Sequence, residues 1–424
     1  MNDPVSESLL ADILSVSRRT IKTWTNSGKL VSSGKKNSQD YFSLEDVKHF
    51  PQIQDLLNSK GSNESTVKPL RPYKSIELFA GAGGLALGLE KAGFEAVALN
   101  EVDKSACETL KTNRPAWNVL EGDIADFKFD GFGKVDFLSG GFPCQAFSYA
   151  GNKRGFEDTR GTLFFQFARS IREADPKVFL GENVRGLLNH DKGRTLETIK
   201  SVIKDLGYTL IEPRVLKALF YRVPQKRERL FLVGIRNDLI QDCEFTWPST
   251  FDRVLTLRDA LLEGELYEMD CPDSPGQLYP KRKAEIMSQV PMGGCWVDLP
   301  DSLQREYMKN SYFLGGGKTG MARRLSWDNP SLTLTCAPAQ KQTERCHPVE
   351  TRPLTVREYA RIQTFPDTWD FRGSTSQQYK QIGNAVPVNL AYSMGTSLVG
   401  LLNQIELTQS GLSKTKRVAR SSGK

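Results

Sequence analysis

The sequence predicts an α/β protein whose main body is an open, Rossmann-like sheet, with a smaller second region and an N-terminal helix-turn-helix. Three observations support this fold class. A strand, a glycine turn and an apolar helix follow one another across residues 73–92. A second strand-like run ends at the acid Glu101, and an apolar run at 135–138 leads into a glycine loop at 140–148. Strands that alternate with helices favour a parallel sheet, which presents its chemistry at the carboxyl ends of its strands.

The composition describes an ordinary soluble protein with an ample core. The 424 residues suggest two or three domains, at about 150 residues each. We expect no bilayer-spanning run and no signal peptide. The seven cysteines are scattered and form no CxxC pair, so neither a disulfide framework nor a metal cluster is expected, and a reducing cytoplasm fits them. The net charge of +7 is compatible with a polyanionic partner.

The N-terminal stretch predicts two short helices joined by a three-residue turn, which fits a helix-turn-helix. An apolar pattern marks the first helix at 8–14, and Ser17 is the expected N-cap of the second helix at 18–25. Residues 31–42 are expected to form a hairpin wing. Ser43, which has an acid three residues further on, is expected to start a third helix.

Arg18, Arg19 and Lys22 would lie on the outer face of the second helix, where they can face a major groove. The stretch resembles winged helix-turn-helix domains of the MerR type. The likeness is carried by Ile13-Leu14-Ser15-Val16-Ser17, Thr20-Ile21, Trp24, Gly28-Lys29-Leu30, Tyr41 and Asp46-Val47. The alternative is a small helical protein-contact domain without DNA affinity, and we favour DNA binding.

Candidate reactive groups follow the later strands. Cys144 stands at a strand end in a loop shaped by glycines and a proline, where a thiol can act as a nucleophile if its pKa is lowered. The alternative for Cys144 is a small buried hydrophobe, the usual state of a free cysteine. Glu182 follows the next buried strand and is expected at the same sheet edge. Arg227 and Arg229 alternate in a strand-like run, so both can point to one face.

The first glycine turn predicts a nucleotide-binding loop. Its spacing is not GxGxxG and it lacks a P-loop lysine, so a dinucleotide is not the favoured ligand. Glu101 lies about twenty residues after the turn, where an acid holds a ribose hydroxyl pair. Asp123 and Ile124 come at the end of a third strand, where they can bracket an adenine ring.

Six ordered motifs resemble those of DNA (cytosine-5) methyltransferases. They are Phe79-Ala80-Gly81-Ala82-Gly83-Gly84, Gly141-Phe142-Pro143-Cys144-Gln145, Glu182-Asn183-Val184, Gln225-Lys226-Arg227-Glu228-Arg229, residues 357–366 and residues 381–387. The match runs from about Ser75 to Leu401. The N-terminal stretch is not part of the core of that family.

The resemblance implies S-adenosylmethionine as the methyl donor and no metal. The positions that it assigns to the donor are Phe79, Gly81, Gly83, Glu101, Asp123, Ile124, Pro143, Leu163 and Asn384. Because Asn384 lies far along the chain, the final helix, at about 386–402, would have to pack back beside the first strand. The catalytic domain would then be discontinuous.

Cytosine C5 is a poor nucleophile, and attack of a thiolate on C6 makes it enamine-like, which is covalent catalysis by Cys144. An acid near N3 assists, and the resemblance gives that role to Glu182. It also places Arg227 and Arg229 near the cytosine O2 and the active-site loop. The alternatives are a helix-capping role for Glu182 and a solvated salt-bridge pair for the two arginines. A bound water is our candidate for removing the C5 proton.

Between residues 245 and 353 the alternation of strands and helices breaks down, and the segment resembles the target-recognition region of the family. Lys318, Arg323, Arg324, Lys341 and Arg345 make this segment basic and suited to phosphate and guanine contacts, the alternative being a solvated basic surface. Thr333 and Leu334 match a pair that family members place near DNA. The target base must leave the duplex to reach Cys144, so base flipping is implied.

These predictions divide the chain into consecutive segments. They are a winged helix-turn-helix module at 1–58, a linker at 59–72, the first part of the catalytic domain at 73–244, a target-recognition domain at 245–353, a small-domain motif with the closing helix at 354–403, and a basic tail at 404–424. The glycine-containing loop at 149–159 is a candidate lid.

The favoured function is methylation of cytosine C5 in duplex DNA, as the partner of a restriction endonuclease in a bacterial cytoplasm, at the nucleoid. The basic second helix further predicts that the N-terminal module binds its own promoter and represses it. One rival is a non-catalytic regulator built on an inactive enzyme, against which the intact set of Cys144, Glu182 and Arg229 argues. The other rival is methylation of tRNA, which the large recognition segment disfavours.

Overall fold

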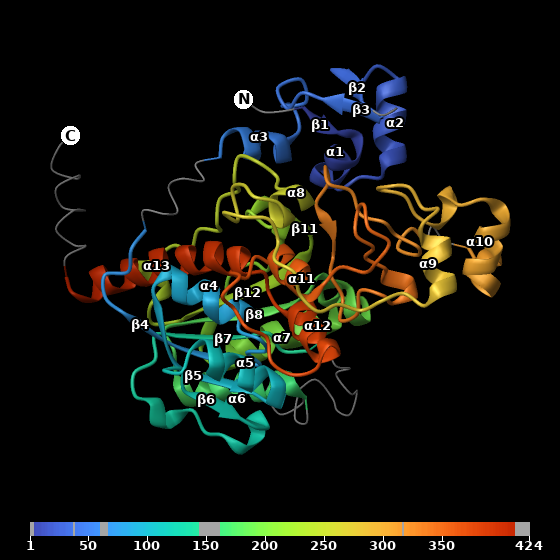
Figure 1. Cartoon of the computed structure of the whole chain (residues 1–424). Coiled ribbons are helices and arrows are strands. Elements are labelled where there is room, and N and C mark those ends of the chain that lie inside the picture. Colours follow the sequence, from blue (N-terminus) through green and yellow to red (C-terminus); the bar gives the residue numbers. More distant parts are fainter. Residues whose placement is uncertain (1–3, 37–38, 60–66, 144–161, 316–317, 412–424) are drawn as a thin grey trace, which may run out of the picture.

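The computed structural model shows a sheet with helices packed around it, a lobe to one side and a small N-terminal module (Figure 1). It describes residues 4–36, 39–59, 67–143, 162–315 and 318–411. Cys144, the candidate lid loop at 149–159 and most of the predicted basic tail lie outside the described residues.

The main sheet has the strand order β10-β12-β8-β7-β4-β5-β6, with β9 paired to β12 off this path. Its strands are β4 (Tyr73–Leu78), β5 (Phe94–Glu101), β6 (Val119–Glu121), β7 (Phe137–Gly140), β8 (Val178–Val184), β9 (Tyr208–Leu210), β10 (Arg214–Lys217) and β12 (Glu228–Arg236). Strands β4 to β8 pair in parallel, and β12 is antiparallel to β8. The strand order reverses at β4, between β5 and β7, and ligand crevices open at such switch points. The predicted α/β class is confirmed.

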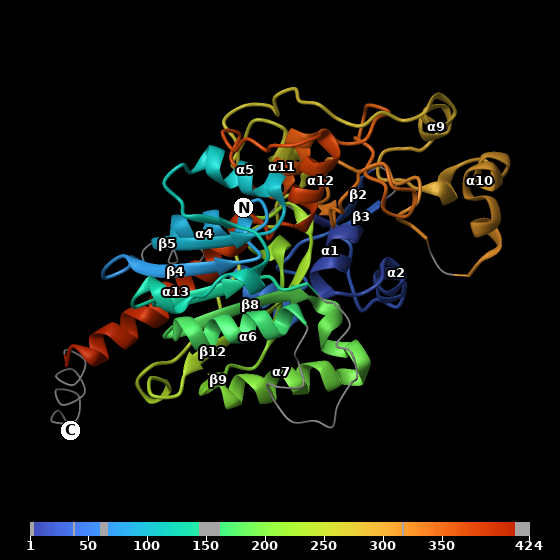
Figure 2. The ribbon, with the colours of Figure 1, turned by 90° about the horizontal axis from the view of Figure 1, so that it is seen from below.

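Alternate residues of the strands point to opposite faces of the sheet and pack into two separate apolar cores. Phe137 joins the cluster beneath α4 (Gly84–Ala92) and α13 (Val388–Gln409), whereas its neighbour Leu138 joins the cluster beneath α6 (Leu163–Ala174) and α7 (Arg194–Asp205). This is the two-residue period of a strand that is buried on both faces. Helix α5 (Lys104–Asn113) follows β5. Figure 2 shows α6 and α7 together on one side of the strands.

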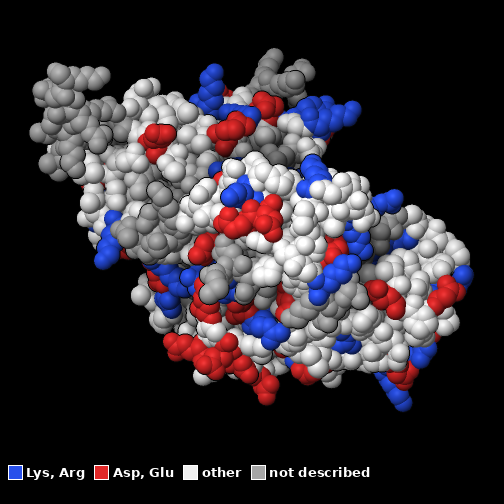
Figure 3. Space-filling view, turned by 90° about the horizontal axis from the view of Figure 1, so that it is seen from above, with Lys and Arg blue, Asp and Glu red and all other residues white. Residues whose placement is uncertain are grey.

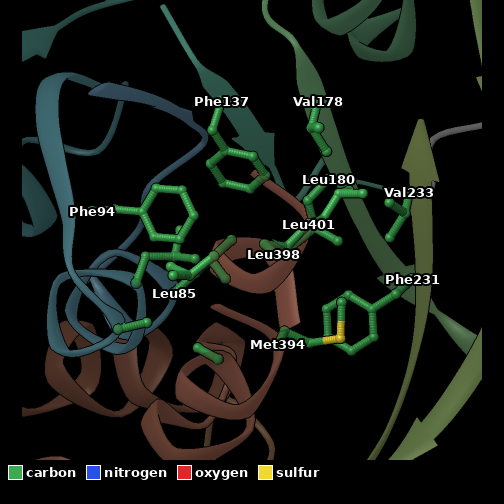
Figure 4. Close-up of a cluster of buried hydrophobic side chains, with 14 of the residues drawn as sticks. Leu85, Phe94, Phe137, Val178, Leu180, Phe231, Val233, Met394, Leu398 and Leu401 are labelled. Carbon is green, nitrogen blue, oxygen red and sulfur yellow. The ribbon is translucent and has the colours of Figure 1, made fainter. Parts of the chain in front are cut away.

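The closing helix α13 returns to the first strand, as expected. Figure 4 shows Met394, Leu398 and Leu401 meeting apolar side chains of the sheet. A Cβ added to Gly88 of α4 would lie 2.4 Å from the Cβ of Ala391, so the small residue lets the two helices touch. The helical stretch Thr375–Gln409 is long and apolar enough to span a membrane, but 78% of its apolar window is buried, which identifies a core helix.

The lobe contains short helices joined by irregular chain, and its own small apolar cluster lies around Met287 and Met308. Its helices are α9 (Lys281–Met287) and α10 (Asp301–Met308). Helix α8 (Leu257–Leu261) and Leu332 of β13 (Ser331–Leu332) pack instead in the core cluster that contains Tyr359 and Phe365. Strand β13 pairs in parallel with β11 (Gln225–Lys226), and α11 (Val356–Ile362) and α12 (Thr375–Asn384) follow the lobe. The interruption of strand–helix alternation after residue 245 is therefore real.

The N-terminal module contains the predicted helices and hairpin. The predicted elements are α1 (Glu7–Leu14), α2 (Arg18–Asn26) and the hairpin strands β2 (Gly34–Lys36) and β3 (Gln39–Phe42). Strand β1 (Val5–Ser6), which the sequence did not predict, pairs with β3, and the third helix is α3 (Pro51–Leu57). The Ser17 hydroxyl caps α2 by accepting from the Thr20 N–H at 3.0 Å. The third helix does not begin at Ser43, because residues 43–50 form turns and α3 starts at Pro51. Proline suits the first helical position, where no N–H is needed.

Candidate active site

A pocket of about 500 Å³ opens at the carboxyl ends of the parallel strands, at the switch point of the sheet. Of the residues predicted for the site, seven line it: Phe79, Gly81, Glu101, Pro143, Glu182, Arg229 and Asn384. Asn384 joins them from the end of α12, more than 280 residues after the glycine turn. The tertiary fold thus brings six separate stretches of chain to one cavity.

Backbone contacts build one side of the pocket. Strand β4 ends at Leu78, and the next residue, Phe79, has a φ of 57°. This left-handed value is uncommon for a residue with a side chain and marks a constrained turn. The Glu101 carboxylate accepts from the N–H groups of Gly81 at 2.7 Å, Val102 at 2.9 Å and Asp103 at 2.8 Å. Through these hydrogen bonds, Glu101 holds the glycine turn beside the end of β5.

Charged side chains build the other side of the pocket. Arg229 Nε lies 2.6 Å from Glu182 Oε1, and the two side chains stand diagonally on the paired strands β12 and β8. A Cβ on Gly141 would lie 2.9 Å from Glu182 Oε2, so the glycine lets the carboxylate approach the backbone. Burial raises the pKa of Glu182, against the opposing effect of the arginines Arg229 and Arg227.

Arg227 lies near the Glu182–Arg229 pair but does not line the described pocket, and its contact with cytosine stays a prediction. Its side chain is buried, and its two terminal nitrogens donate to the carbonyls of Leu334 at 3.2 Å and Gly383 at 2.9 Å. Arg227 stands between β11 and β12, where the regular alternation is interrupted. Desolvation lowers the pKa of Arg227, with the positive charge of Arg229 acting in the same direction.

Four residues that the sequence assigned to the donor do not line the described pocket. Ile124 is buried in the core, and the Asp123 carboxylate caps a short turn by accepting from the Ala125 N–H at 2.9 Å. Leu163 opens α6 and packs against the same core. Gly83 is closed off because a Cβ there would meet Leu110 Cδ2 at 2.7 Å. Their contact with a donor stays a prediction.

Glu77 is a pocket residue that the sequence interpretation missed. It lies in β4, is 3% exposed, and one of its carboxylate oxygens has no hydrogen-bond partner in the described residues. Burial raises the pKa of Glu77 to about 8. The available signal was an acid between the apolar residues Ile76 and Leu78 of the strand, since charged residues are rarely buried without a partner.

The expected DNA contacts fall into two groups. Arg18, Arg19 and Lys22 are exposed on α2, as predicted. In the lobe, Arg324 is buried, and its nitrogens donate to carbonyls of the lobe and to one threonine hydroxyl: Met287, Val290, His347, Val349, Glu350 and Thr351. Leu334 is 1% exposed within the core. Neither side chain is exposed in this structure, and the contact of both residues with DNA stays a prediction.

The other two lobe residues are engaged with neighbouring backbone. Thr333 Oγ1 donates to the Lys226 carbonyl at 2.7 Å, and Arg323 is half-buried and donates to the Gly293 carbonyl at 2.7 Å. Figure 3, a view onto the top of the molecule, shows basic and acidic side chains intermixed rather than one basic field. Among the described residues, no cluster of His, Cys, Asp and Glu could hold a metal ion.

Comparison with known proteins gives two family matches. Residues 73–400 match the C-5 cytosine-specific DNA methylase family, and residues 7–73 match the MerR HTH family of regulatory proteins. The chain is 63% identical over 407 residues to the type II methyltransferase M.Eco47II of Escherichia coli, covering 96% of this chain and 97% of that protein. It is 60% identical over 400 residues to M.PspPI of Psychrobacter sp. (strain TA137), covering 94% and 96%. It is 38% identical to M.HhaI of Haemophilus parahaemolyticus, covering 78% and 97%.

Solved structures give the same fold. A DNA modification methyltransferase encoded in an E. coli prophage aligns with a TM-score of 0.61 at 24% identity, covering 78% of this chain and 99% of that one. The S. pombe Dnmt2 methyltransferase aligns with a TM-score of 0.53 at 20% identity, with the same coverage.

Proposed function

Because this chain belongs to the C-5 cytosine-specific DNA methylases and is a type II DNA (cytosine-5) methyltransferase, we propose that the pocket between β4 and β8 is where the methyl group is transferred. The observation that carries this assignment is the juxtaposition of the Glu101-locked glycine turn with the buried Glu182–Arg229 pair in one cavity. The side with Glu101 and the glycine turn suits a donor that contains a nucleoside, and the side with Glu182 and Arg229 suits a pyrimidine ring.

The family implies S-adenosylmethionine as the methyl donor, which supplies an electrophilic methyl group on a sulfonium. The residues present fit this donor. Glu101 would accept from ribose hydroxyls, and the Glu77 oxygen that has no hydrogen-bond partner among the described residues would accept from an ammonium group. A Cβ on Gly84 would lie 2.3 Å from the Val386 carbonyl, so the glycine lets the turn pack closely against the pocket residues that precede α13.

We assign the nucleophile to Cys144, which directly follows the pocket residue Pro143 in the sequence. Its thiolate would add to cytosine C6, C5 would take the methyl group, and loss of the C5 proton would expel the thiolate and restore the ring. Glu182 would hold N3 as the ring gains electron density, and a raised pKa suits a group that shares a proton there. Arg229 would hold Glu182 and the cytosine O2.

The depth of the Glu182–Arg229 pair supports base flipping. Both side chains are only 12% exposed, so a cytosine stacked in a duplex cannot reach them. The same proposal assigns residues 245–353 to target recognition, and residues 73–244 with 354–403 to a discontinuous catalytic domain. The biological role would be protection of host DNA in a bacterial cytoplasm against a partner restriction endonuclease.

A trapping experiment tests the covalent step. A duplex with 5-fluorocytosine at the target cannot lose its C5 substituent as a proton, so the enzyme should stay bound to the DNA through denaturing electrophoresis. Cys144→Ser should abolish both this complex and methyl incorporation from labelled S-adenosylmethionine. The matched control is Cys336→Ser, because Cys336 is exposed and its Sγ lies 3.2 Å from the Oδ1 of the pocket residue Asn384. Full methyl incorporation by Cys144→Ser would contradict the proposal. Labelling of tRNA instead of duplex DNA would show that tRNA is the substrate.

We further propose that the N-terminal module binds DNA upstream of its own coding region and represses transcription. The exposed basic residues Arg18, Arg19 and Lys22 of α2 and the MerR-type match support this role. A footprint of the full chain over the upstream region should be lost in the double variant Arg19→Ala/Lys22→Ala, with methylation retained. An unprotected upstream region with the wild-type chain would rule out autoregulation.

A further inference from the structure

The short strand β11 and the arginine after it lie where the catalytic body, the lobe and the N-terminal module meet. Gln225 and Arg227 make contacts toward the turn at residues 382–385, whereas Lys226 makes its ion pair with the N-terminal module. Gln225 and Arg227 are buried, at 0% and 1% exposure. The two sides make different contacts, and these contacts connect the module to the pocket.

The inner side holds the turn that contains Asn384. Gln225 Nε2 donates to Gln363 Oε1 at 2.9 Å, and Gln363 Nε2 donates to the carbonyls of Ile382 at 2.7 Å and Ala385 at 3.2 Å. Every bond in this chain is buried, where hydrogen bonds are strong and an unmade one is costly. The carbonyl positions around Asn384 therefore depend on Gln225.

Arg227 makes a second set of hydrogen bonds that hold the same turn. It donates to the Gly383 carbonyl at 2.9 Å and to the Leu334 carbonyl at 3.2 Å. A Cβ on Gly383 would lie 2.5 Å from the Thr335 carbonyl oxygen, so the turn is packed tightly on the lobe. Asn384 and Ala385 line the pocket, and a shift of β11 would therefore move the pocket wall.

The outer side of β11 contacts the N-terminal module. Lys226 Nζ lies 2.5 Å from Asp12 Oδ2 at the end of α1, in a pair whose side chains are 21% and 24% exposed. Lys217 Nζ donates to the carbonyls of Asp12 at 3.0 Å and Ile13 at 3.4 Å, which are among the last carbonyls of α1. Leu219 packs into the apolar core of the module. The module is thus docked on the strands that precede Arg229.

We propose that Asp12 and Lys226 are positioning residues for methyl transfer, through which the docked module sets β11 and the pocket wall that contains Asn384. The module is then a working part of the catalytic site, in addition to any DNA that it binds itself. A ligand of the module that disturbs the Asp12–Lys226 pair would lower methylation without touching the pocket. This inference rests on the assignment of the pocket as the site of transfer.

The test is a charge-exchange series in the full chain. Lys226→Met and Asp12→Asn should each lower kcat about tenfold, within the range of coupling energies carried by packed networks. The KM for DNA should change little, because the DNA-facing surfaces are not altered. The exchanged pair Asp12→Lys with Lys226→Asp should recover most of the rate, as should Lys226→Arg alone. Trapping with 5-fluorocytosine DNA counts the active sites in each preparation, so that kcat can be expressed per active site. A purely structural loss would lower the number of active sites and leave the kcat of each one unchanged.

The matched control is Glu45→Gln, which removes the exposed Glu45–Lys48 pair elsewhere in the module. It should leave kcat unchanged. Wild-type kcat in Lys226→Met and Asp12→Asn, or no recovery in both the exchanged pair and Lys226→Arg, would overturn the positioning role. A wild-type enzyme that forms no trapped complex would instead contradict the proposed function itself.

Discussion

Helix α2 and the lobe segment 320–336 are both basic in sequence, yet they use their charges in opposite ways. The basic residues of α2 stand in solvent, with Ile21 as its buried residue. In the lobe segment, Arg324 is 4% exposed and surrounded by backbone carbonyls. The same residue type is available for DNA in one region and is part of the internal framework in the other.

The difference follows from how each backbone satisfies its own hydrogen bonds. The carbonyls of α2 are largely occupied within the helix, so its side chains are free to point outward. The lobe segment has little regular structure, and its buried carbonyls need donors from elsewhere. A guanidinium offers five N–H donors in a fixed fork and is suited to that task. In an irregular region, a basic residue is therefore a candidate for internal support before it is a candidate for DNA contact.

The largest expected effect is that of Arg324→Ala. Removing the guanidinium leaves several buried carbonyls without donors, and we expect a loss of roughly 3 kcal/mol or more in the free energy of unfolding. Chemical unfolding of the full chain measures it. Arg323→Ala is the matched control, since Arg323 is half-buried and should cost about 1 kcal/mol or less. Equal stability of the two variants would remove the contrast between the regions.

The next largest effect is expected for Gly383→Ala, because Gly383 packs against Thr335 of the lobe segment. The added methyl would overlap the Thr335 carbonyl, and we expect a loss of roughly 1–3 kcal/mol together with reduced methylation. Gly264→Ala is the control, because nothing lies within 4 Å of its added Cβ. Wild-type stability of Gly383→Ala would mean that the backbone of the lobe segment moves readily to accommodate the added methyl group, and that the segment is not rigid.

Changes in α2 should affect DNA affinity rather than stability. Arg19→Ala/Lys22→Ala removes two exposed charges, and we expect the slope of log K against log salt for upstream DNA to fall by about 0.9 for each lost phosphate contact. The unfolding midpoint should stay within the error of the wild-type value. Salt titration of binding to an upstream fragment measures the slope, and an unchanged slope would exclude contact of these residues with phosphates.

The smallest effect concerns pH. Glu344 is fully buried in the lobe, beside Lys283 and Tyr307, and burial raises the pKa of its carboxyl above the ordinary 4.5. A folded-state pKa above the unfolded one means that stability from this group is present below about pH 4.5 and is lost as the pH rises through the folded value. Glu344→Gln should reduce that decline, as measured by unfolding midpoints across pH. An identical pH profile in wild type and variant would contradict the shift.

What the sequence determined by itself are the features that depend on neighbours along the chain. The acids Glu101 and Glu182 at or near their strand ends, the glycine turn and the Ser17 cap of α2 are local features. Parallel strands then bring their carboxyl ends to one edge by topology. The ordered motifs likewise indicated the methyltransferase family before any contact was known. These features needed only spacing and residue type.

The tertiary structure alone decided where the arginines point, how Glu77 enters the pocket and how the module docks. Arg324 meets carbonyls up to 37 positions away, Arg227 meets one 156 positions away, and Lys226 meets Asp12 across more than 200 residues. Such contacts depend on which buried backbone groups lack a partner after the chain has folded. That need is set by three-dimensional packing, and residue spacing does not encode it.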